Sequence, residues 1–224
     1  MDKNLLIIGA GEFADIAYEY FTHDSNYTVI GFAVEQAHLK EKNKFGLPIL
    51  ALETIDKEFS IHDVEVHVAV TSTQLNQLRE RLFKIAKNKG YKFANYISSN
   101  ALVWRTVDFG ENIFIFENNN LQHGVKIGDG AVLWSGNHIG HQSEIGDFCF
   151  VSSHVVISGF CKIGKRSFLG VNASFADFTE IAEDTFVGLG SAVNKSSLVA
   201  GQILTGSPAT ASKVSSYRYF KVKP

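Results

Sequence analysis

Large apolar residues recur at every sixth position through the second half of the chain. The series runs from Ile97 to Val199, and each of its positions holds Ile, Leu, Val or Phe. A period of six fits neither a helix nor a simple alternating strand. It is typical of a parallel β-helix, whose triangular coil has three short strands with the large residue pointing inward. The members of the series are Ile97, Val103, Phe109, Ile115, Leu121, Ile127, Leu133, Ile139, Ile145, Val151, Ile157, Ile163, Leu169, Phe175, Ile181, Val187, Val193 and Val199.

Glycines and small residues hold fixed places beside this series. Glycine follows the large residue in many repeats, and a small residue usually precedes it by two positions. Small residues suit the crowded corner of a coil, and glycine suits places where a close approach excludes a side chain. Because stacked coils bury one another's faces, we expect a continuous apolar core of roughly six coils over residues 97–205. The spacing does not fix the hand of the coil.

The first 96 residues follow a different pattern. The segment "KNLLIIGAGEFADIAYEYF" predicts a strand, a glycine turn and a helix, and "YTVIGFAV" and "VEVHVAV" predict two further buried strands. The segment "QLNQLRERLFKIAKNKG" predicts an amphipathic helix that starts at Gln74 and stops at Gly90. Strands that alternate with helices predict a small parallel sheet.

The turn "GAGEFA" resembles a dinucleotide-binding turn only in part. It lacks the third glycine of the dinucleotide fingerprint, so an NAD-dependent oxidoreductase is not favoured. A strand-to-helix turn of this kind still presents backbone N–H groups that suit an anion or a sugar nucleotide. A tight turn with only a packing role is the alternative.

The length, net charge and composition of the chain exclude several classes of protein. The chain has 224 residues, enough for two modest domains. Its formal net charge of −2 gives no electrostatic footprint for nucleic acid. It has no run of about 18 apolar residues and no signal-peptide pattern at its start, so we expect a cytoplasmic protein that does not enter the membrane. The cysteines, Cys149 and Cys161, are too few for a disulfide framework and are expected to pack as small apolar residues.

Three stretches together resemble a known family. The chain opens with "IIGAGEFA", the hexapeptide series contains "GHQSEIGD", and the chain closes with "LTGSPATASK". In these features it resembles the bacterial left-handed β-helix acetyltransferases of nucleotide-linked amino sugars. They include the UDP-4-amino-sugar N-acetyltransferase of bacillosamine synthesis, perosamine N-acetyltransferase and the sialic acid O-acetyltransferase group. The resemblance covers nearly the whole chain.

The resemblance implies an α/β plus β-solenoid fold. A small Rossmann-like domain with a parallel sheet would bind the nucleotide sugar (1–96). A left-handed parallel β-helix would carry the acetyltransferase site (97–205), with a C-terminal tail after it (206–224). Proteins similar to this one are homotrimers that hold acetyl-CoA, as co-substrate, in the groove between adjacent β-helices. Surface polysaccharide synthesis is the setting that the family implies.

The resemblance also gives a role to one histidine. The family carries its base in a pattern of the form I-x-H-x-x-x-I-G, which runs here from Ile139 to Gly146 and places His141 in that role. The acceptor amine must lose a proton as it attacks the thioester, and imidazole suits that task. His138 is the alternative base. His154 is expected to be a wall or core residue, and Phe150 stands where a relative has a histidine that contacts acetyl-CoA.

Relatives often flank this base with glutamate, which orients the ring. Here the neighbours are Gly140 and Gln142. Another group must therefore orient the imidazole, and the candidates are Gln142, Glu144 and Asn137.

A zinc site built from His138, His141 and His154 is a further alternative, because zinc favours imidazole ligands. The related gamma carbonic anhydrases bind zinc with a close histidine pair separated by four residues, whereas only two residues separate His138 from His141, and His154 lies further away. We therefore expect no metal.

The resemblance assigns further residues to the two ligands. Alignment places acetyl-CoA against the backbone at Gly159, Gly170, Val171, Gly188 and Leu189, and a backbone N–H near Gly159 is expected to stabilise the thioester oxyanion. It places the nucleotide sugar against Gly11, Glu12, Phe13, Val34, Glu35 and Gln74, at the carboxyl ends of the predicted strands.

The sequence therefore predicts an acetyl-CoA-dependent sugar N-acetyltransferase in which the amine attacks directly and His141 acts as general base. One alternative is an O-acetyltransferase that acts on a sialic acid or another sugar hydroxyl. Another is a non-catalytic trimeric scaffold, for which the missing carboxylate beside His141 is the best support. The sugar, the nucleotide and the pathway stay open.

Overall fold

The protein is described by a computed structural model that covers residues 3–222. These residues divide into two compact units. The first contains residues 3–71 and Arg79–Tyr96, and the second contains Ser72–Leu78 and residues 97–222. Among the described residues, no helix is long and apolar enough to cross a membrane.

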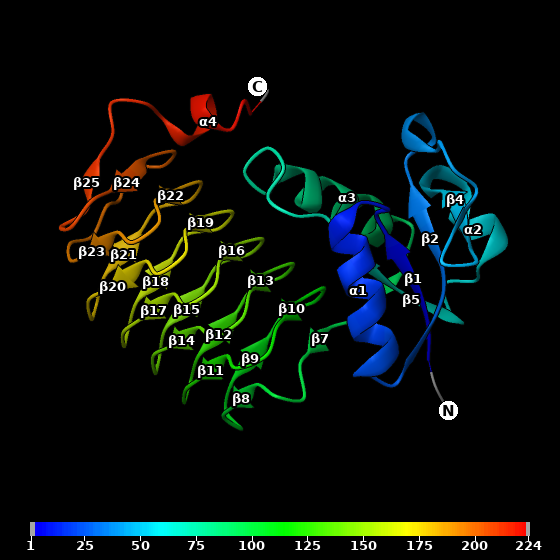
Figure 1. Cartoon of the computed structure of the whole chain (residues 1–224), viewed down its shortest axis with the longest axis horizontal. Helices are drawn as coiled ribbons and strands as arrows, with labels where there is room; N and C mark the ends of the chain where they lie inside the picture. The colour runs from blue at the N-terminus through cyan, green and yellow to red at the C-terminus, as the bar shows by residue number, and fades with distance from the viewer. Residues whose placement is uncertain (1–2, 223–224) are drawn as a thin grey trace. The chain divides into compact units, whose positions relative to one another are not determined.

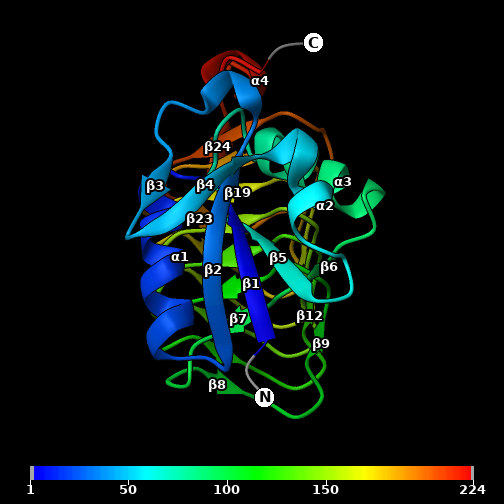
Figure 2. The same cartoon turned by 90° about the vertical axis from the view of Figure 1, so that its right-hand side faces the viewer.

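The first unit is built around one sheet (Figure 2). The strand order is β3-β4-β2-β1-β5-β6, and all neighbours pair in parallel except β3 and β4. The predicted parallel sheet is therefore confirmed. The strands are β1 (Lys3–Ile8), β2 (Tyr27–Val34), β3 (Asn43–Lys44), β4 (Leu47–Ala51), β5 (Val64–Val68) and β6 (Lys92–Phe93). The helices are α1 (Glu12–His23), α2 (Ile55–Glu58) and α3 (Gln77–Asn88), with short 3-10 turns at η1 (Gln36–His38) and η2 (Leu52–Thr54).

The turn between β1 and α1 depends on Gly9. Its φ is +131°, and a Cβ atom at this position would lie 2.6 Å from the Ala69 carbonyl oxygen. No L-amino acid with a side chain fits both conditions. Gly9 therefore lets the chain turn tightly into α1, which buries Phe13, Ala17 and Phe21.

The helix α3 starts later than the sequence predicts. The predicted start was Gln74, but Gln74, Leu75 and Asn76 all have positive φ, between +52° and +66°, and α3 begins at Gln77. The left-handed conformation cannot continue a right-handed helix. Asn76 is fully buried within the second unit, where its amide donates to the carbonyl oxygens of Arg166 and Ser167. This buried contact explains why the segment departs from helix.

The second unit is a parallel β-helix (Figure 1). Paired residues on successive coils are 18 positions apart, as in the pair Leu121 and Ile139, so each coil contains three hexapeptides. Within residues 97–222 the strands form three sheets, which we name by their strand number as the eight-strand, six-strand and five-strand faces. The predicted solenoid is confirmed, and its parallel sheets are consistent with a left-handed coil.

Strands of two or three residues make up each face. The eight-strand face contains β7 (Tyr96–Ile97), β10 (Phe114–Ile115), β13 (Val132–Leu133), β16 (Phe150–Val151), β19 (Phe168–Leu169), β22 (Phe186–Val187), β24 (Ile203–Thr205) and β25 (Thr210–Ala211). The six-strand face contains β8 (Leu102–Val103), β11 (Asn120–Leu121), β14 (His138–Ile139), β17 (Val156–Ile157), β20 (Ser174–Phe175) and β23 (Ala192–Val193). The five-strand face contains β9 (Asp108–Phe109), β12 (Lys126–Ile127), β15 (Glu144–Ile145), β18 (Lys162–Ile163) and β21 (Glu180–Ile181).

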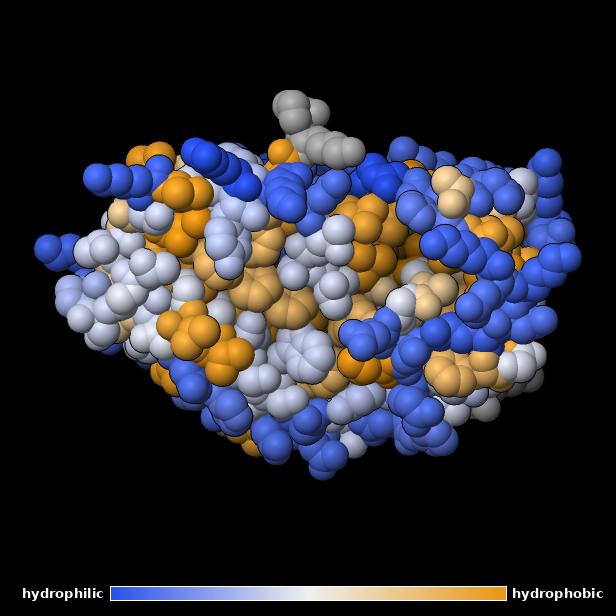
Figure 3. Space-filling model, turned by 45° about the horizontal axis from the view of Figure 1, so that its top comes forward, coloured by the Kyte–Doolittle hydropathy of each residue, from blue (hydrophilic) through white to orange (hydrophobic). Residues whose placement is uncertain are grey.

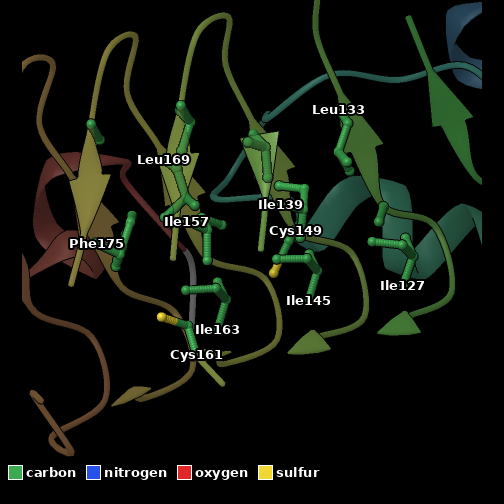
Figure 4. Packing of buried hydrophobic residues seen from close by; sticks show 14 of the residues in the cluster. Ile127, Leu133, Ile139, Ile145, Cys149, Ile157, Cys161, Ile163, Leu169 and Phe175 are labelled. Atoms are coloured by element: carbon green, nitrogen blue, oxygen red, sulfur yellow. The ribbon is translucent and has the colours of Figure 1, made fainter. Parts of the chain in front are cut away.

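The predicted apolar series forms the interior of these coils (Figure 4). From Ile115 to Val193 every member is at most 3% exposed, and Cys149 and Cys161 pack among them as free thiols. Each fully buried aliphatic side chain of this kind contributes about 1.5–3 kcal/mol by leaving water. Ile97, Val103 and Phe109 are only partly buried, because they belong to the first coil.

The series ends one position earlier than the sequence predicts. Val199 was expected to point inward, but it is 62% exposed. After Val193 the coil shortens: Ile181 bridges Ser197, 16 positions further on, so Val199 lies outside the inward register. Leu204 rather than residue 205 then pairs with Val187 and enters the core. The prediction for Val199 is therefore wrong, because the last coil is shorter than 18 residues.

The C-terminal segment folds back on the β-helix. It ends in the short helix α4 (Ser216–Tyr219). The Tyr217 hydroxyl donates to the buried Asp184 carboxylate, which also receives two hydrogen bonds from Arg166. Phe220 packs against the rings of Phe168 and Phe186 on the eight-strand face.

Candidate active site at a corner of the β-helix

His141 lies in the turn that links the six-strand face to the five-strand face, which we call the His141 corner. The preceding strand β14 is anchored by Ile139, which is fully buried. The chain then turns through Gln142, whose φ is +59°. The His141 side chain is exposed at this turn. A rigid coil thus presents an accessible imidazole, as the sequence predicts.

Neighbouring coils hold the backbone of His141 in place. Its N–H donates to the Gln122 side-chain oxygen at 2.9 Å, and its carbonyl accepts the Phe160 N–H at 3.0 Å. The Gln142 N–H donates to the His123 carbonyl at 2.9 Å. Both peptide groups of the turn are therefore tied to the coil before and the coil after it.

The imidazole ring lies against Gly159, one coil further on. A Cβ atom built on Gly159 would be 2.7 Å from Cε1 and 2.9 Å from Nε2 of His141. The Phe160 ring meets the imidazole at right angles, with 5.1 Å between the ring centroids. The ring is thus bounded by a glycine backbone and an aromatic side chain.

Residues at 18-residue spacing share this corner, and sequence reasoning missed several of them. They include His123, whose Nδ1 lies 2.7 Å from the Thr106 hydroxyl, and Asp177, whose carboxylate accepts the Gly159 N–H at 2.8 Å. Gln122 and Phe160 were missed for the same reason. The 18-residue repeat was visible in the sequence and would have found all four, because it places them one or two coils from His141.

The predicted orienting residues do not contact the ring. Asn137 is 1% exposed, and its amide group serves the Trp134 carbonyl and the Val155 N–H, so this prediction is wrong. Glu144 belongs to the five-strand face and forms a salt bridge of 3.0 Å with Lys126. The prediction that Glu144 orients the ring is therefore also wrong. The Gln142 side chain lies over Gly124 instead. Within residues 3–222, no side chain hydrogen-bonds to the His141 ring nitrogens.

The other histidines of this stretch lie elsewhere on the coil. His138 projects from the six-strand face between Asn120 and Val156. His154 lies at the corner between the eight-strand and six-strand faces, with its ring over Gly136. The three side chains are not gathered in one site, and the described residues contain no cluster of three potential metal ligands.

In the first unit, the predicted nucleotide residues surround the start of α1 and the end of β2. Gly11 is the N-cap residue of α1, with open space where its Cβ would be, and Glu12 is exposed. Phe13 is 4% exposed, so its side chain belongs to the core. Only the Phe13 backbone, in the first turn of α1, is left to contact a nucleotide.

Glu35 follows Val34 at the end of β2 and is engaged by a cation. Arg81 donates two hydrogen bonds to its carboxylate, at 2.6 and 2.8 Å, and this pairing holds the pKa of Glu35 below its ordinary value. Gln74 belongs to the second unit, whereas Gly11, Val34 and Glu35 belong to the first.

The β-helix matches a family of known repeats. Residues 124–159 match the model described as bacterial transferase hexapeptide (six repeats). No curated protein matches the chain. Solved structures match over nearly its whole length. The first is a mutant of perosamine N-acetyltransferase from Caulobacter crescentus in complex with CoA and GDP-perosamine. It is 24% identical and has a TM-score of 0.83, and the match covers 96% of this chain and 99% of that one.

Two further structures are similar. The acetyltransferase domain of PglB from Neisseria gonorrhoeae is 20% identical, with a TM-score of 0.82 over 93% of this chain and 99% of that one. WeeI from Acinetobacter baumannii is also 20% identical, with a TM-score of 0.64 over 93% of this chain and 99% of that one.

The chain therefore shares the hexapeptide-repeat fold of these solved structures. The resemblance predicted from the sequence is confirmed at the level of the fold.

Within this hexapeptide fold, the predicted acetyl-CoA residues lie at two different corners. Gly159 is at the His141 corner, and its N–H, the expected oxyanion donor, is already engaged by Asp177. Gly170, Val171, Gly188 and Leu189 lie between the eight-strand and six-strand faces, at what we call the Leu189 corner. One chain therefore does not bring Gly159 together with the other four.

Exposed apolar side chains mark the region between these corners. Leu189 is 81% exposed and Phe178 67% exposed. Figure 3 shows one face of the molecule, on which apolar residues lie exposed among hydrophilic ones. The exposed large apolar residues on the six-strand face and its two corners are Leu102, Trp104, Val156, Phe160, Val171, Phe178 and Leu189.

Proposed function

We propose that this chain transfers the acetyl group of acetyl-CoA to the amine of a nucleotide-linked amino-deoxy sugar, with His141 as general base. The observation that carries the proposal is an exposed imidazole held by a rigid hexapeptide coil. Solved structures of the same fold include a perosamine N-acetyltransferase in complex with CoA and GDP-perosamine. They also include an acetyltransferase domain in complex with acetyl coenzyme A.

The proposed reaction is direct acyl transfer. The sugar amine attacks the thioester carbonyl and a C–N bond forms, while His141 accepts the proton that the amine loses. The tetrahedral intermediate then collapses and the C–S bond breaks, and the sulfur takes the proton held by His141, so that CoA leaves as the thiol. Neither cysteine serves as a nucleophile in this scheme, because Cys149 and Cys161 are both buried. Burial raises the pKa of the Cys161 thiol, which disfavours its reactive thiolate.

We further propose that the site is shared between copies of the chain in a homotrimer of left-handed β-helices. The acetyl-CoA residues at the His141 corner and the Leu189 corner are separated by one face of the coil, which is about one extended hexapeptide or roughly 20 Å wide. Exposed apolar side chains line that separation. Several large apolar side chains exposed on one face of a coil are typical of an interaction site. A second copy packed beside the first would bring its Leu189 corner to the His141 corner.

The nucleotide sugar is proposed to bind the first unit (1–96) at the start of α1. Within residues 3–222, the N–H groups of Gly11 and Glu12 donate to no described residue. Lys44 places its ammonium group 3.0 Å from the Ala10 carbonyl oxygen, beside the same turn. Free N–H groups at a helix start, next to a cation, suit phosphate oxygens. Residues 97–205 would then carry the transferase site, 206–224 the tail, and the reaction would be cytoplasmic.

A panel of nucleotide sugars tests the proposal. Purified protein is incubated with acetyl-CoA and UDP-, GDP- or dTDP-linked sugars, each in an amino form and a hydroxyl form, and the products are read by mass spectrometry. We expect one acetyl group to be added to an amino form. Transfer to hydroxyl forms alone would favour the O-acetyltransferase, and no transfer to any sugar would favour the non-catalytic scaffold.

A further inference from the structure

A general base works best when a third group fixes the direction of its ring. The structure offers no such group to His141 by hydrogen bonding, because no described side chain bonds to its ring nitrogens. An exposed histidine otherwise turns freely about its terminal torsion, which has broad minima. Some other restraint must hold the imidazole if it is to meet a substrate in one orientation.

The His141 ring packs directly against the backbone of Gly159. The Cε1, Nε2 and Nδ1 atoms of His141 would lie 2.7, 2.9 and 3.2 Å from a Cβ atom on Gly159. The first two distances are below the closest approach that real Cβ atoms make. The imidazole therefore occupies the space that any other residue at this position would fill. Gly159 stands outside the hexapeptide glycine series, so the repeat alone does not explain it.

The Phe160 side chain packs against the His141 ring from a second direction. The two ring planes meet at 82°, the edge-to-face geometry that aromatic pairs prefer. Phe160 has a φ of +56°, and its N–H donates to the His141 carbonyl, so its own position is fixed by the coil. Phe178 in turn stacks on Phe160, with 5.0 Å between the ring centroids and an angle of 5° between the ring planes, so a second ring supports the first.

Core packing does not account for this aromatic pair. Phe160 is 43% exposed and Phe178 is 67% exposed, and neither belongs to the interior cluster of the coil. Two exposed phenylalanines in the left-handed conformation are costly choices for a surface turn. The contact of Phe160 with His141, and the stacking of Phe178 on Phe160, supply a reason for them.

We infer that Gly159 and Phe160 are positioning residues that hold the His141 imidazole by packing, in place of a hydrogen-bonded carboxylate. The inference rests on the proposed function. In it, Phe178 supports Phe160 from behind.

The competing explanation is a carboxylate at the same corner. Asp177 also meets Gly159, since its carboxylate accepts the Gly159 N–H at 2.8 Å. Asp177→Asn removes the charge but keeps an oxygen that accepts this hydrogen bond. This variant therefore tests the charge of Asp177 without changing the packing of Gly159 and Phe160 against His141.

The kinetic test compares Phe160→Ala, Phe160→Tyr and Asp177→Asn with the parent protein, using the acceptor sugar from the panel. We expect Phe160→Ala to lower kcat by about 10- to 100-fold, the cost of a misplaced catalytic group, with little change in KM for either substrate. Phe160→Tyr should keep most of the activity, because its ring preserves the edge contact. Asp177→Asn should stay close to the parent. Parent-like kcat in Phe160→Ala, or loss of activity only in Asp177→Asn, would overturn the inference.

A spectroscopic test does not depend on activity. The protein has eight histidines, and selective isotope labelling gives their imidazole protons in an NMR spectrum. The His141 signal is identified by its loss in His141→Asn. We expect the ring current of Phe160 to shift this signal, so that Phe160→Ala moves it and Phe160→Tyr does not. An unmoved signal in Phe160→Ala would show that the aromatic ring does not hold His141, whether or not the acetyltransferase proposal stands.

Discussion

At the scale of single residues, His67 is a titratable group that the fold keeps neutral. It lies on β5, fully buried against the Phe21 ring, and its Nδ1–H donates to the Ala94 carbonyl at 3.0 Å. Burial, with a smaller contribution from the positive charge of Arg79, lowers the pKa of His67 to about 4. The backbone hydrogen bond opposes this shift but is outweighed.

The stability of the protein should therefore fall in mild acid. Between the unfolded-state pKa near 6.5 and the folded-state value of about 4, the unfolded chain binds a proton at His67 that the folded chain refuses. Stability is fully present above this window and decreases as the pH falls through it, by about 3 kcal/mol in total. Urea unfolding at several pH values measures the slope. His67→Leu should start less stable but show a flatter slope, and an equal slope would contradict this explanation.

Sequence reasoning singled out His141 but not its surroundings. His141 was proposed as the base because the segment from Ile139 to Gly146 resembles the family's pattern, and the repeat places it at a turn where the structure leaves it exposed. Asn137 and Glu144 failed as orienting groups because residues near in sequence point into the core or onto another face of the coil. The true neighbours, such as Gln122 and Asp177, come from other coils, and their contacts depend on stacking rather than on sequence distance.

At the scale of elements, each two-residue strand places one side chain inside the coil and one outside. On β17, Ile157 is fully buried while its neighbour Val156 is 46% exposed. The stacked interior depends on the first of these positions and not on the second.

This difference gives a matched pair of variants. Ile157→Ala should lower the free energy of unfolding by about 2–5 kcal/mol, because it removes buried methylene groups and leaves a cavity between neighbouring coils. Val156→Ala, next to it in the same strand, should change the free energy much less. Denaturant unfolding of both variants checks this, and equal losses would contradict the inward and outward assignment.

The period of six predicted the regular elements and failed at their ends. It located the inward residues of the coils from Ile115 to Val193, since each hexapeptide repeats the same local geometry. It failed at Val199, because the shortening of the last coil, in which Ile181 bridges Ser197, leaves no trace in the apolar pattern. The helical period likewise placed the start of α3 at Gln74, because periodicity does not reveal the left-handed backbone before Gln77.

At the scale of the whole molecule, the proposed site needs two copies of the chain. The His141 corner and the Leu189 corner lie at opposite edges of the six-strand face. Every chain contains both corners, so the sequence does not show which copy supplies which corner to a given site. A closed symmetric assembly gives every copy both roles.

Mixed assemblies test this arrangement. His141→Asn removes the base, and Leu189→Glu places a negative charge where the negatively charged CoA is proposed to pass. We expect each variant alone to be nearly inactive, whereas co-expression should restore activity, because some interfaces then join an intact His141 corner to an intact Leu189 corner. Mixed assemblies that remain as inactive as the separate variants would contradict a shared site.

The central claim is that the repeating coil presents His141 as the base for acetyl transfer. The most direct measurement is kcat for acetyl transfer to the sugar amine in His141→Asn, beside His138→Asn and His154→Asn as controls from the same stretch. We expect kcat to fall by about 10²- to 10⁴-fold in His141→Asn alone, the usual contribution of a positioned general base, with unchanged thermal stability in all three. Near-parent turnover in His141→Asn, or an equal loss in His138→Asn, would contradict the account.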